Sequence, residues 1–253
     1  MKSGLLGFGE VGSRFARGLK SSGASIQGYD KQWKVDPMGR RIQHRASEAG
    51  IALTETPQAL SEWAHVLISV TAPVVAIETA QTVAPFLRRG QIYADFNSAG
   101  PRIKQEIADL VMGRECGFAD GGILGSLQLD GHKVPIVVSG PQAETLASLL
   151  NGYGMQITAI GSEPGQASAL KVVRSVFTKG LEVVLLECLL AAQAFGIREP
   201  ILATLIQFME SPPASDLFTM LIATHAVHAR RRMGEMAGVM ALHLQHLAPW
   251  FGL

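Results

Sequence analysis

The chain has 253 residues, enough for a domain of about 150 residues and a smaller second one. Its 47% hydrophobic and 17% charged residues are typical of a globular protein, with a slight apolar excess that hints at a buried subunit interface. A net charge of +1 gives no reason to expect nucleic acid or an anionic membrane as a partner. Cys116 and Cys188 lie far apart without metal or redox spacing, which favours two reduced thiols in a cytoplasmic protein.

Short apolar segments alternate with helix-length segments over the first 160 residues. The strand-like segments read GLLGFG, SIQGYD, IALT, HVLISV, QIYADF, KVPIVV and MQITAI. This alternation is typical of a parallel sheet with helices on both faces. We therefore predict an α/β fold with a Rossmann-type, doubly wound, mainly parallel sheet over residues 1–163.

A glycine motif lies between the first strand and a helix predicted from about residue 11 to 21. It reads GFGEVG and comprises Gly7, Phe8, Gly9, Glu10, Val11 and Gly12. Gly7 permits a tight turn, Gly9 lets the backbone approach a pyrophosphate, and Gly12 allows close packing of helix on strand. Asp30, after the second strand, is placed to accept hydrogen bonds from the adenosine ribose and to repel a 2′-phosphate. The motif predicts a dinucleotide site that prefers NAD, with NADP as the alternative because Lys31 and Lys34 follow closely.

Two later strands are also followed by candidate cofactor residues. These are Ser69, Val70 and Thr71 after one strand, and Asn97 and Ser98 after the next. Ligands of open α/β sheets bind at the carboxyl ends of the strands, so we expect these residues to line the cofactor site. Capping of a loop is an equally good explanation for each polar side chain taken alone.

From residue 164 onward the pattern is almost continuous helix, which predicts an all-helical domain over 164–253. Residues 166–195 contain no proline and one glycine, and so predict one interdomain helix of about 30 residues. Its polar positions recur every three or four residues and form one stripe, made up of Ser168, Lys171, Ser175, Thr178 and Glu182. The stripe can face solvent, a salt bridge or a ligand cleft.

The last helical region carries a basic cluster after a break at Pro212 and Pro213. A solvated face is the plain interpretation of Arg230–Arg232, and the alternative is that Arg231 or Arg232 binds an acidic substrate. His225 and His228 have helical spacing but no third candidate ligand, so we predict no metal site.

Several ordered motifs resemble the β-hydroxyacid dehydrogenase family, which includes 3-hydroxyisobutyrate, tartronate semialdehyde and 6-phosphogluconate dehydrogenases. The matching segments are GLLGFGEVGSRFARGL, DFNSAGP, FADGGILGS, GQASALKVVRS and LLECLLAAQAFG. The short C-terminal part is similar to that of a phosphogluconate-dehydrogenase-like branch. The resemblance implies that Lys171 is the catalytic acid/base, its pKa lowered by desolvation and by the positive nicotinamide ring.

The chain departs from the family pattern at two substrate positions. Ser175 stands where the family usually has Asn, and Leu124 replaces the serine that binds the substrate carboxylate. Ser126 is the candidate substitute for that serine. The predicted substrate-binding residues are Leu124, Gly125, Ser126, Ser175, Thr178 and Arg231.

These observations predict an NAD(P)-dependent oxidoreductase that transfers a hydride between the nicotinamide and a small β-hydroxy acid. We expect a cytoplasmic homodimer, in which the long helix is buried between subunits. One alternative is an imine reductase-like enzyme, which is expected to carry another residue in place of Lys171. The other is a non-catalytic dinucleotide-binding sensor. The sequence leaves open the hydroxy acid, its decarboxylation and the direction of the reaction.

Overall fold

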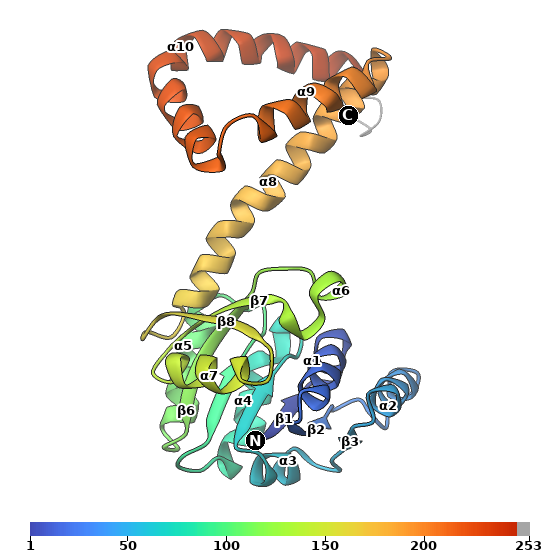
Figure 1. Ribbon diagram of the computed structural model, residues 1–253, viewed down its shortest axis with the longest axis vertical. Helices are drawn as coiled ribbons and strands as arrows, with labels where there is room; N and C mark the ends of the chain where they lie inside the picture. The colour runs from blue at the N-terminus through green and yellow to red at the C-terminus, as the bar shows by residue number, and fades with distance from the viewer. Residues whose placement is uncertain (247–253) are drawn as a thin grey trace. The chain divides into compact units, whose positions relative to one another are not determined.

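In the computed structural model, residues 1–246 are described, and the chain divides into two compact units between Arg174 and Ser175 (Figure 1). The division falls inside helix α8 (Gln166–Ala194), the long helix that the sequence predicts. The first unit contains the whole sheet, and the second contains helices α9 (Arg198–Glu210) and α10 (Ala214–His246).

The first unit is built on one eight-stranded sheet in the order β3-β2-β1-β4-β5-β6-β7-β8. All neighbouring strands are parallel except β6 and β7, which are antiparallel. The strands are β1 (Lys2–Leu6), β2 (Ser25–Tyr29), β3 (Ala52–Leu53), β4 (Val66–Ser69), β5 (Ile92–Asp95), β6 (Gly117–Ile123), β7 (Pro135–Ser139) and β8 (Gln156–Gly161). This order confirms the predicted Rossmann-type sheet. Strands β2 and β3 follow β1 on one side, whereas β4 and the later strands lie on its other side. Such sheets bind their ligands at this switch in strand order, between β1 and β4.

Two apolar layers cover the faces of the sheet, because successive strand residues point to opposite sides. Leu5 belongs to one layer and its neighbour Leu6 to the other. Helices α1 (Glu10–Ser21), α2 (Met38–Ala49) and α7 (Ala143–Asn151) contribute to the first layer, and α3 (Pro57–Trp63), α4 (Ala76–Val83) and α5 (Pro101–Met112) to the second. The short helix α6 (Leu127–Asp130) lies between β6 and β7. Strands β4 and β5 are therefore buried along their whole length, as their unbroken apolar runs predict.

Strand β6 is absent from the predicted strands, because its sequence GFADGGI has three glycines, which weaken strand preference. The glycines make room for close neighbours. A Cβ at Gly121 would lie 2.1 Å from a ring carbon of Phe96, and one at Gly122 would lie 3.0 Å from the carbonyl oxygen of Ala167. The segment that resembles a substrate loop is thus largely a central strand, packed tightly against the start of α8.

The second unit is helical, as predicted, and buries few of its own side chains. Among its residues 175–241, only Ala192 and Leu217 are buried. Phe177 of α8 packs edge-on against Phe218 of α10, with 5.4 Å between ring centroids. Helix α10 is bent at His228, whose backbone angles are not helical. In the part of the chain that is described, no helix is long and apolar enough to cross a membrane.

Candidate active site

The glycine motif forms the turn between β1 and α1. Gly7 has a φ of 93°, a left-handed conformation that favours glycine, and its N–H donates to the Tyr29 carbonyl over 2.9 Å. A Cβ at Gly12 would lie 2.1 Å from the Gly7 carbonyl oxygen, so helix α1 packs directly on the turn. These contacts give Gly7 and Gly12 the roles that the sequence predicts.

The space beside Gly9 is open, because no atom other than those of its two chain neighbours lies within 4 Å of the place where its Cβ would be. Gly9 is the N-cap of α1, and Ser13 N–H donates to its carbonyl as the first backbone hydrogen bond of the helix. The N–H groups of Glu10, Val11 and Gly12 therefore lie in the first turn of α1 and have no acceptor within the helix. An anion fits this position, since helix N-termini bind phosphate through these free N–H groups. The residues present fit the pyrophosphate of a dinucleotide.

Asp30 connects the end of β2 to the glycine turn. Its Oδ2 accepts from Phe8 N–H at 2.8 Å, and its Oδ1 accepts from Gln32 N–H at 2.9 Å. Lys31 pairs with Glu78 at 2.6 Å, which raises the pKa of the Lys31 ammonium, and Lys34 pairs with Glu55. Both lysines after Asp30 are therefore engaged with carboxylates.

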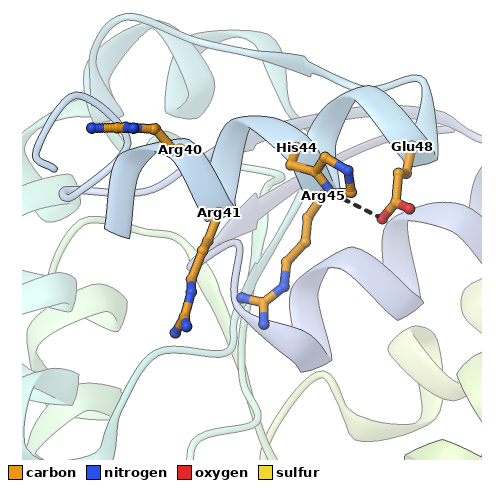
Figure 2. Close-up of a pocket in the computed structure, with 5 residues that line it drawn as sticks. All are labelled: Arg40, Arg41, His44, Arg45 and Glu48. Atoms are coloured by element: carbon orange, nitrogen blue, oxygen red, sulfur yellow. Dashed lines mark ion pairs between the residues drawn. The ribbon is translucent and has the colours of Figure 1, made fainter. Parts of the chain in front are cut away.

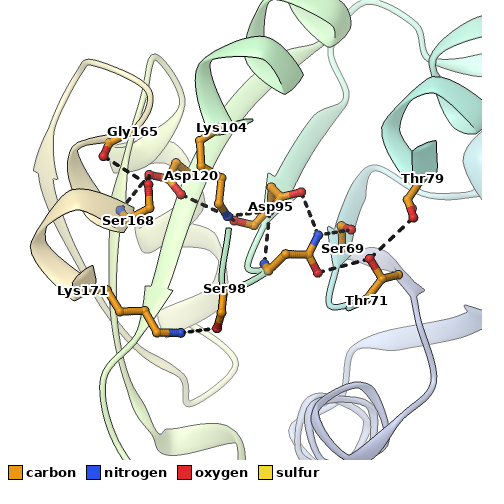
Figure 3. Close-up of polar contacts among 11 residues, drawn as sticks. Ser69, Thr71, Thr79, Asp95, Ser98, Lys104, Asp120, Gly165, Ser168 and Lys171 are labelled. Carbon is orange, nitrogen blue, oxygen red and sulfur yellow. Dashed lines mark hydrogen bonds and ion pairs between the residues drawn. The ribbon is translucent and has the colours of Figure 1, made fainter. Parts of the chain in front are cut away.

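Asn97 joins the ends of β4 and β5. Its Nδ2 donates to Ser69 Oγ and to Asp95 Oδ2, each at 3.0 Å, and its Oδ1 accepts from Thr71 at 3.3 Å (Figure 3). Asn97 and Ser69 are buried, so these hydrogen bonds replace water. Their first role is to hold two strand ends together, and Thr71 is the member of the group that is closest to the glycine turn, 3.0 Å from the place of a Gly7 Cβ.

Lys171 reaches the same edge of the sheet from the second turn of α8. Its Nζ donates to Ser98 Oγ at 2.6 Å, and Ser98 is exposed at the end of β5 (Figure 3). The lysine is only half-buried, so its ammonium head lies at the surface of this unit and not in the core. The structure thus brings the predicted catalytic lysine together with one predicted cofactor residue.

Beneath this contact lies a buried group of charges that the sequence reasoning missed. Lys104 of α5, Asp95 of β5 and Asp120 of β6 are all completely buried. Lys104 Nζ lies 2.5 Å from Asp95 Oδ1 and 3.2 Å from Asp120 Oδ1. Burial raises the pKa of the Asp95 carboxyl, and the neighbouring Lys104 opposes this only in part. One signal was available in the sequence, because position 104 shares a helix face with the buried Ile107, Ala108 and Val111.

Comparison with known proteins assigns the family. The family model of the NAD binding domain of 6-phosphogluconate dehydrogenase matches residues 2–161. The chain belongs to this family. Its sheet is therefore an NAD(P)-binding domain, and the glycine turn described above lies within the matched residues.

Three solved structures share the fold. A conserved protein of unknown function, described as structurally similar to 3-hydroxyacid dehydrogenases, is 31% identical and has a TM-score of 0.69, with coverage of 97% of this chain and 90% of the other. The 3-hydroxyisobutyrate dehydrogenase of Mycobacterium tuberculosis with L-serine is 16% identical (TM-score 0.71; coverage 84% and 72%). An imine reductase variant from Myxococcus stipitatus in complex with NAD⁺ is also 16% identical (TM-score 0.78; coverage 97% and 86%). The last two likenesses concern the fold alone.

The predicted substrate segment 124–126 lies where β6 ends. Leu124 N–H donates to the Pro135 carbonyl, and Leu124 O accepts from Arg174 Nη1, each at 2.9 Å. Gly125 packs beside Val134, and Ser126 is the N-cap residue of α6 without a side-chain cap. Arg174 was not predicted as a site residue. It lies one turn beyond Lys171 on α8, so both side chains leave the same helix face and reach the same edge of the family's NAD(P)-binding domain.

Three predicted substrate residues belong to the second unit. Ser175 and Thr178 lie on α8, and Arg231 lies on α10, where its Nε is 3.3 Å from Glu235 Oε1. The ion pair is exposed and spans one helical turn. The substrate roles of these residues stay predictions.

A second charged surface lies along α2. Arg40, Arg41, His44, Arg45 and Glu48 line an open hollow of about 400 Å³ (Figure 2). Arg40 pairs with Asp36, and Glu48 lies 3.5 Å from His44 Nδ1 and 3.9 Å from Arg17. Because one helix supplies every lining residue, the hollow is a solvated helix face and not a built cleft. Among residues 1–241, whose side chains the structure describes, no group of three or more His, Cys, Asp and Glu could hold a metal ion.

Proposed function

We propose that the protein is an NAD-preferring dehydrogenase of a small β-hydroxy acid, with Lys171 as the general acid/base. The observation that carries the proposal is the 2.6 Å hydrogen bond from Lys171 Nζ to Ser98 Oγ. It places an ionisable amine at the carboxyl edge of the sheet, where Gly9 leaves room for a dinucleotide. Membership of a family with an NAD(P)-binding domain supports the reaction class.

In the proposed reaction, Lys171 transfers the proton and Ser98 orients Lys171. NAD⁺ held at the glycine turn would supply the acceptor for the hydride that leaves the alcohol carbon of the substrate. Lys171 takes the hydroxyl proton as this carbon becomes a carbonyl, and releases the proton to water. Ser98 orients the amine by accepting one of its hydrogen bonds. In the reverse direction, Lys171 donates the proton to the carbonyl oxygen.

NAD is the preferred cofactor in this proposal because of the charges after β2. Asp30 offers a carboxylate where a 2′-phosphate would lie, and this carboxylate repels it. Lys31 is paired with Glu78, and Lys34 is paired with Glu55. Either lysine would have to break its ion pair before it could bind a 2′-phosphate and offset the repulsion by Asp30.

A homodimer is part of the proposal. The second unit exposes large apolar side chains on every helix, among them Val176, Ile222, Val227 and Met233, each more than 70% exposed. Exposed apolar surface of this extent is typical of an interface between subunits. Sedimentation equilibrium of the full chain should give twice the mass of 27.0 kDa, and a monomer at all concentrations would exclude this part. The cytoplasmic location stays a prediction.

The deciding experiment measures NADH formation with NAD⁺ and a panel of β-hydroxy acids. We compare the unaltered protein with Lys171→Met and, as a matched control, Lys179→Met, which alters an exposed lysine of the same helix. Loss of general acid/base catalysis should lower kcat about 100-fold to 10,000-fold in Lys171→Met only. Equal turnover in all three proteins would refute the mechanism. Cofactor binding without oxidation of any acid would favour the sensor, and reduction of cyclic imines would favour the imine reductase.

A further inference from the structure

Lys104 is a charged residue with no exposed surface. Its Nζ donates to the backbone carbonyl of Asp95 at 2.7 Å and to Asp95 Oδ1 at 2.5 Å, and it lies 3.2 Å from Asp120 Oδ1 (Figure 3). One ammonium group thus lies between two carboxylates from neighbouring strands. Such groups are costly to desolvate, and removal of the shared partner leaves uncompensated charge in the core.

Each carboxylate holds a different segment of the candidate site. Asp95 accepts from the backbone N–H of Asn97 at 3.1 Å and from its Nδ2 at 3.0 Å. Asp120 Oδ2 accepts from both the N–H and the Oγ of Ser168, each at 2.9 Å. The Ser168 N–H belongs to the first turn of α8, where a carboxylate also gains from the helix dipole. Asp95 therefore fixes the loop next to Ser98, and Asp120 fixes the turn that precedes Lys171.

We infer that Lys104 is a positioning residue, which holds the Asp95 and Asp120 carboxylates together and thereby sets Lys171 against Ser98. Without the ammonium, two buried carboxylates on adjacent strands repel each other, and they relieve the repulsion by moving apart or by taking up a proton. Either response loosens the hydrogen bonds to Asn97 and Ser168. The importance of the Lys171–Ser98 contact for catalysis rests on the proposed function, whereas the coupling between the Asn97 segment and the Ser168 segment does not.

Amide hydrogen exchange of the full chain tests the coupling without substrate or cofactor. The variant is Lys104→Met, which has a similar length and no charge, and the control is Lys133→Met, at an exposed lysine. We expect exchange at the Asn97 and Ser168 amides to become at least about 10-fold faster in Lys104→Met, with little change in β1 and β2. Unchanged exchange at both amides, or a uniform increase that includes β1 and β2, would overturn the inference.

Asp120→Asn provides a second test, which is independent of whether Lys104→Met folds. The amide oxygen keeps an acceptor for Ser168, while the charge that Lys104 spans is removed. Because Asn97 bonds to Asp95 and not to Asp120, a change at its amide has to be relayed through Lys104 or through the direct pairing of Asp95 with Asp120 across β5 and β6. We expect faster exchange at Asn97 as well as at Ser168. A response confined to Ser168 would show that Lys104 does not couple the two segments.

Kinetics then separate this inference from the proposed function. If a hydroxy acid is oxidised, Lys104→Met should lower kcat about 100-fold, the cost of a displacement of about 1 Å, and leave the KM for NAD nearly unchanged. An unchanged kcat together with faster exchange would show that Lys104 couples the two segments but does not position Lys171 for catalysis. If the unaltered protein oxidises no hydroxy acid, the proposed function fails, and the exchange experiment still decides whether Lys104 couples the two segments.

Discussion

Two glycines of the turn between β1 and α1 should respond to the same substitution in different ways. Gly9→Ala adds a methyl group where no atom lies within 4 Å, and Gly12→Ala adds one only 2.1 Å from the Gly7 carbonyl oxygen. The first change fills the space that we assign to the pyrophosphate, and the second forces α1 away from the turn. We therefore expect Gly9→Ala to weaken cofactor binding while the fold keeps its stability, and Gly12→Ala to weaken cofactor binding and lower the stability as well.

The magnitudes follow from these distances. The Gly12 contact is with a backbone oxygen, which cannot rotate away, so the clash should cost about 3 kcal/mol, of which helix propensity returns about 1 kcal/mol. The net loss of about 2 kcal/mol corresponds to a melting temperature lower by roughly 4 to 8 °C. Gly9→Ala changes only an N-cap residue and should cost less than about 1 kcal/mol. The loss of one charge-assisted hydrogen bond from a backbone N–H to a phosphate should weaken NAD binding by about 10-fold to 100-fold in both variants.

Thermal unfolding and NADH fluorescence titration measure the two effects separately. Gly113→Ala is a suitable control, because Gly113 ends α5 with a φ of −60° and has its nearest atom at 3.3 Å. If Gly9→Ala bound NADH as tightly as the unaltered protein, the pyrophosphate would not lie at this turn. If Gly12→Ala unfolded at the same temperature, the contact between α1 and the turn would be looser than the structure shows.

Three further predictions concern side chains of the first unit. Asp30→Asn should lower the preference for NAD over NADP at least about 10-fold, measured as the ratio of the two dissociation constants, because it removes the charge that repels a 2′-phosphate and keeps an acceptor for Phe8 N–H. Ser98→Ala should lower kcat about 5-fold to 10-fold at unchanged NAD affinity, since Lys171 loses one orienting hydrogen bond. Burial lowers the pKa of His132 from its ordinary value of 6.5. As the pH falls below about 6.5, the unfolded chain therefore binds a proton at His132 before the folded protein does. The free energy of unfolding should decrease over this pH range. In chemical denaturation, His132→Gln should remove this part of the pH dependence.

The geometry of the glycine turn could be predicted from the sequence because its requirements are local. A left-handed turn, an open N-cap and a close helix contact each demand glycine at one position, and Gly7, Gly9 and Gly12 supply them within six residues. Alternation of apolar segments likewise predicts a parallel sheet without any knowledge of distant contacts. The long helix followed from the lack of helix breakers between 166 and 195.

The substrate side could not be predicted in the same way. Strand β6 lacks the β-branched run that marks a buried strand, because its glycines make room for Phe96 and for the start of α8. Arg174 reaches the Leu124 carbonyl from 50 residues away in the chain, and no local pattern encodes that contact. Both features depend on which segments the fold brings together.

Lys171 and Lys104 show most clearly how far the site can be predicted from the sequence. Lys171 stands in an apolar run and is half-buried with its head at the surface, whereas Lys104 stands in an ordinary amphipathic helix and has no exposure at all. Helical spacing already places Lys104 on the buried face of α5, which conflicts with its charge unless an acidic partner lies beneath it. Asp95 ends the preceding strand, and Asp120 lies on β6, the strand that composition conceals. The missed strand and the missed buried charge therefore have a single cause, since a central strand at 117–123 would have placed a second carboxylate under a buried lysine.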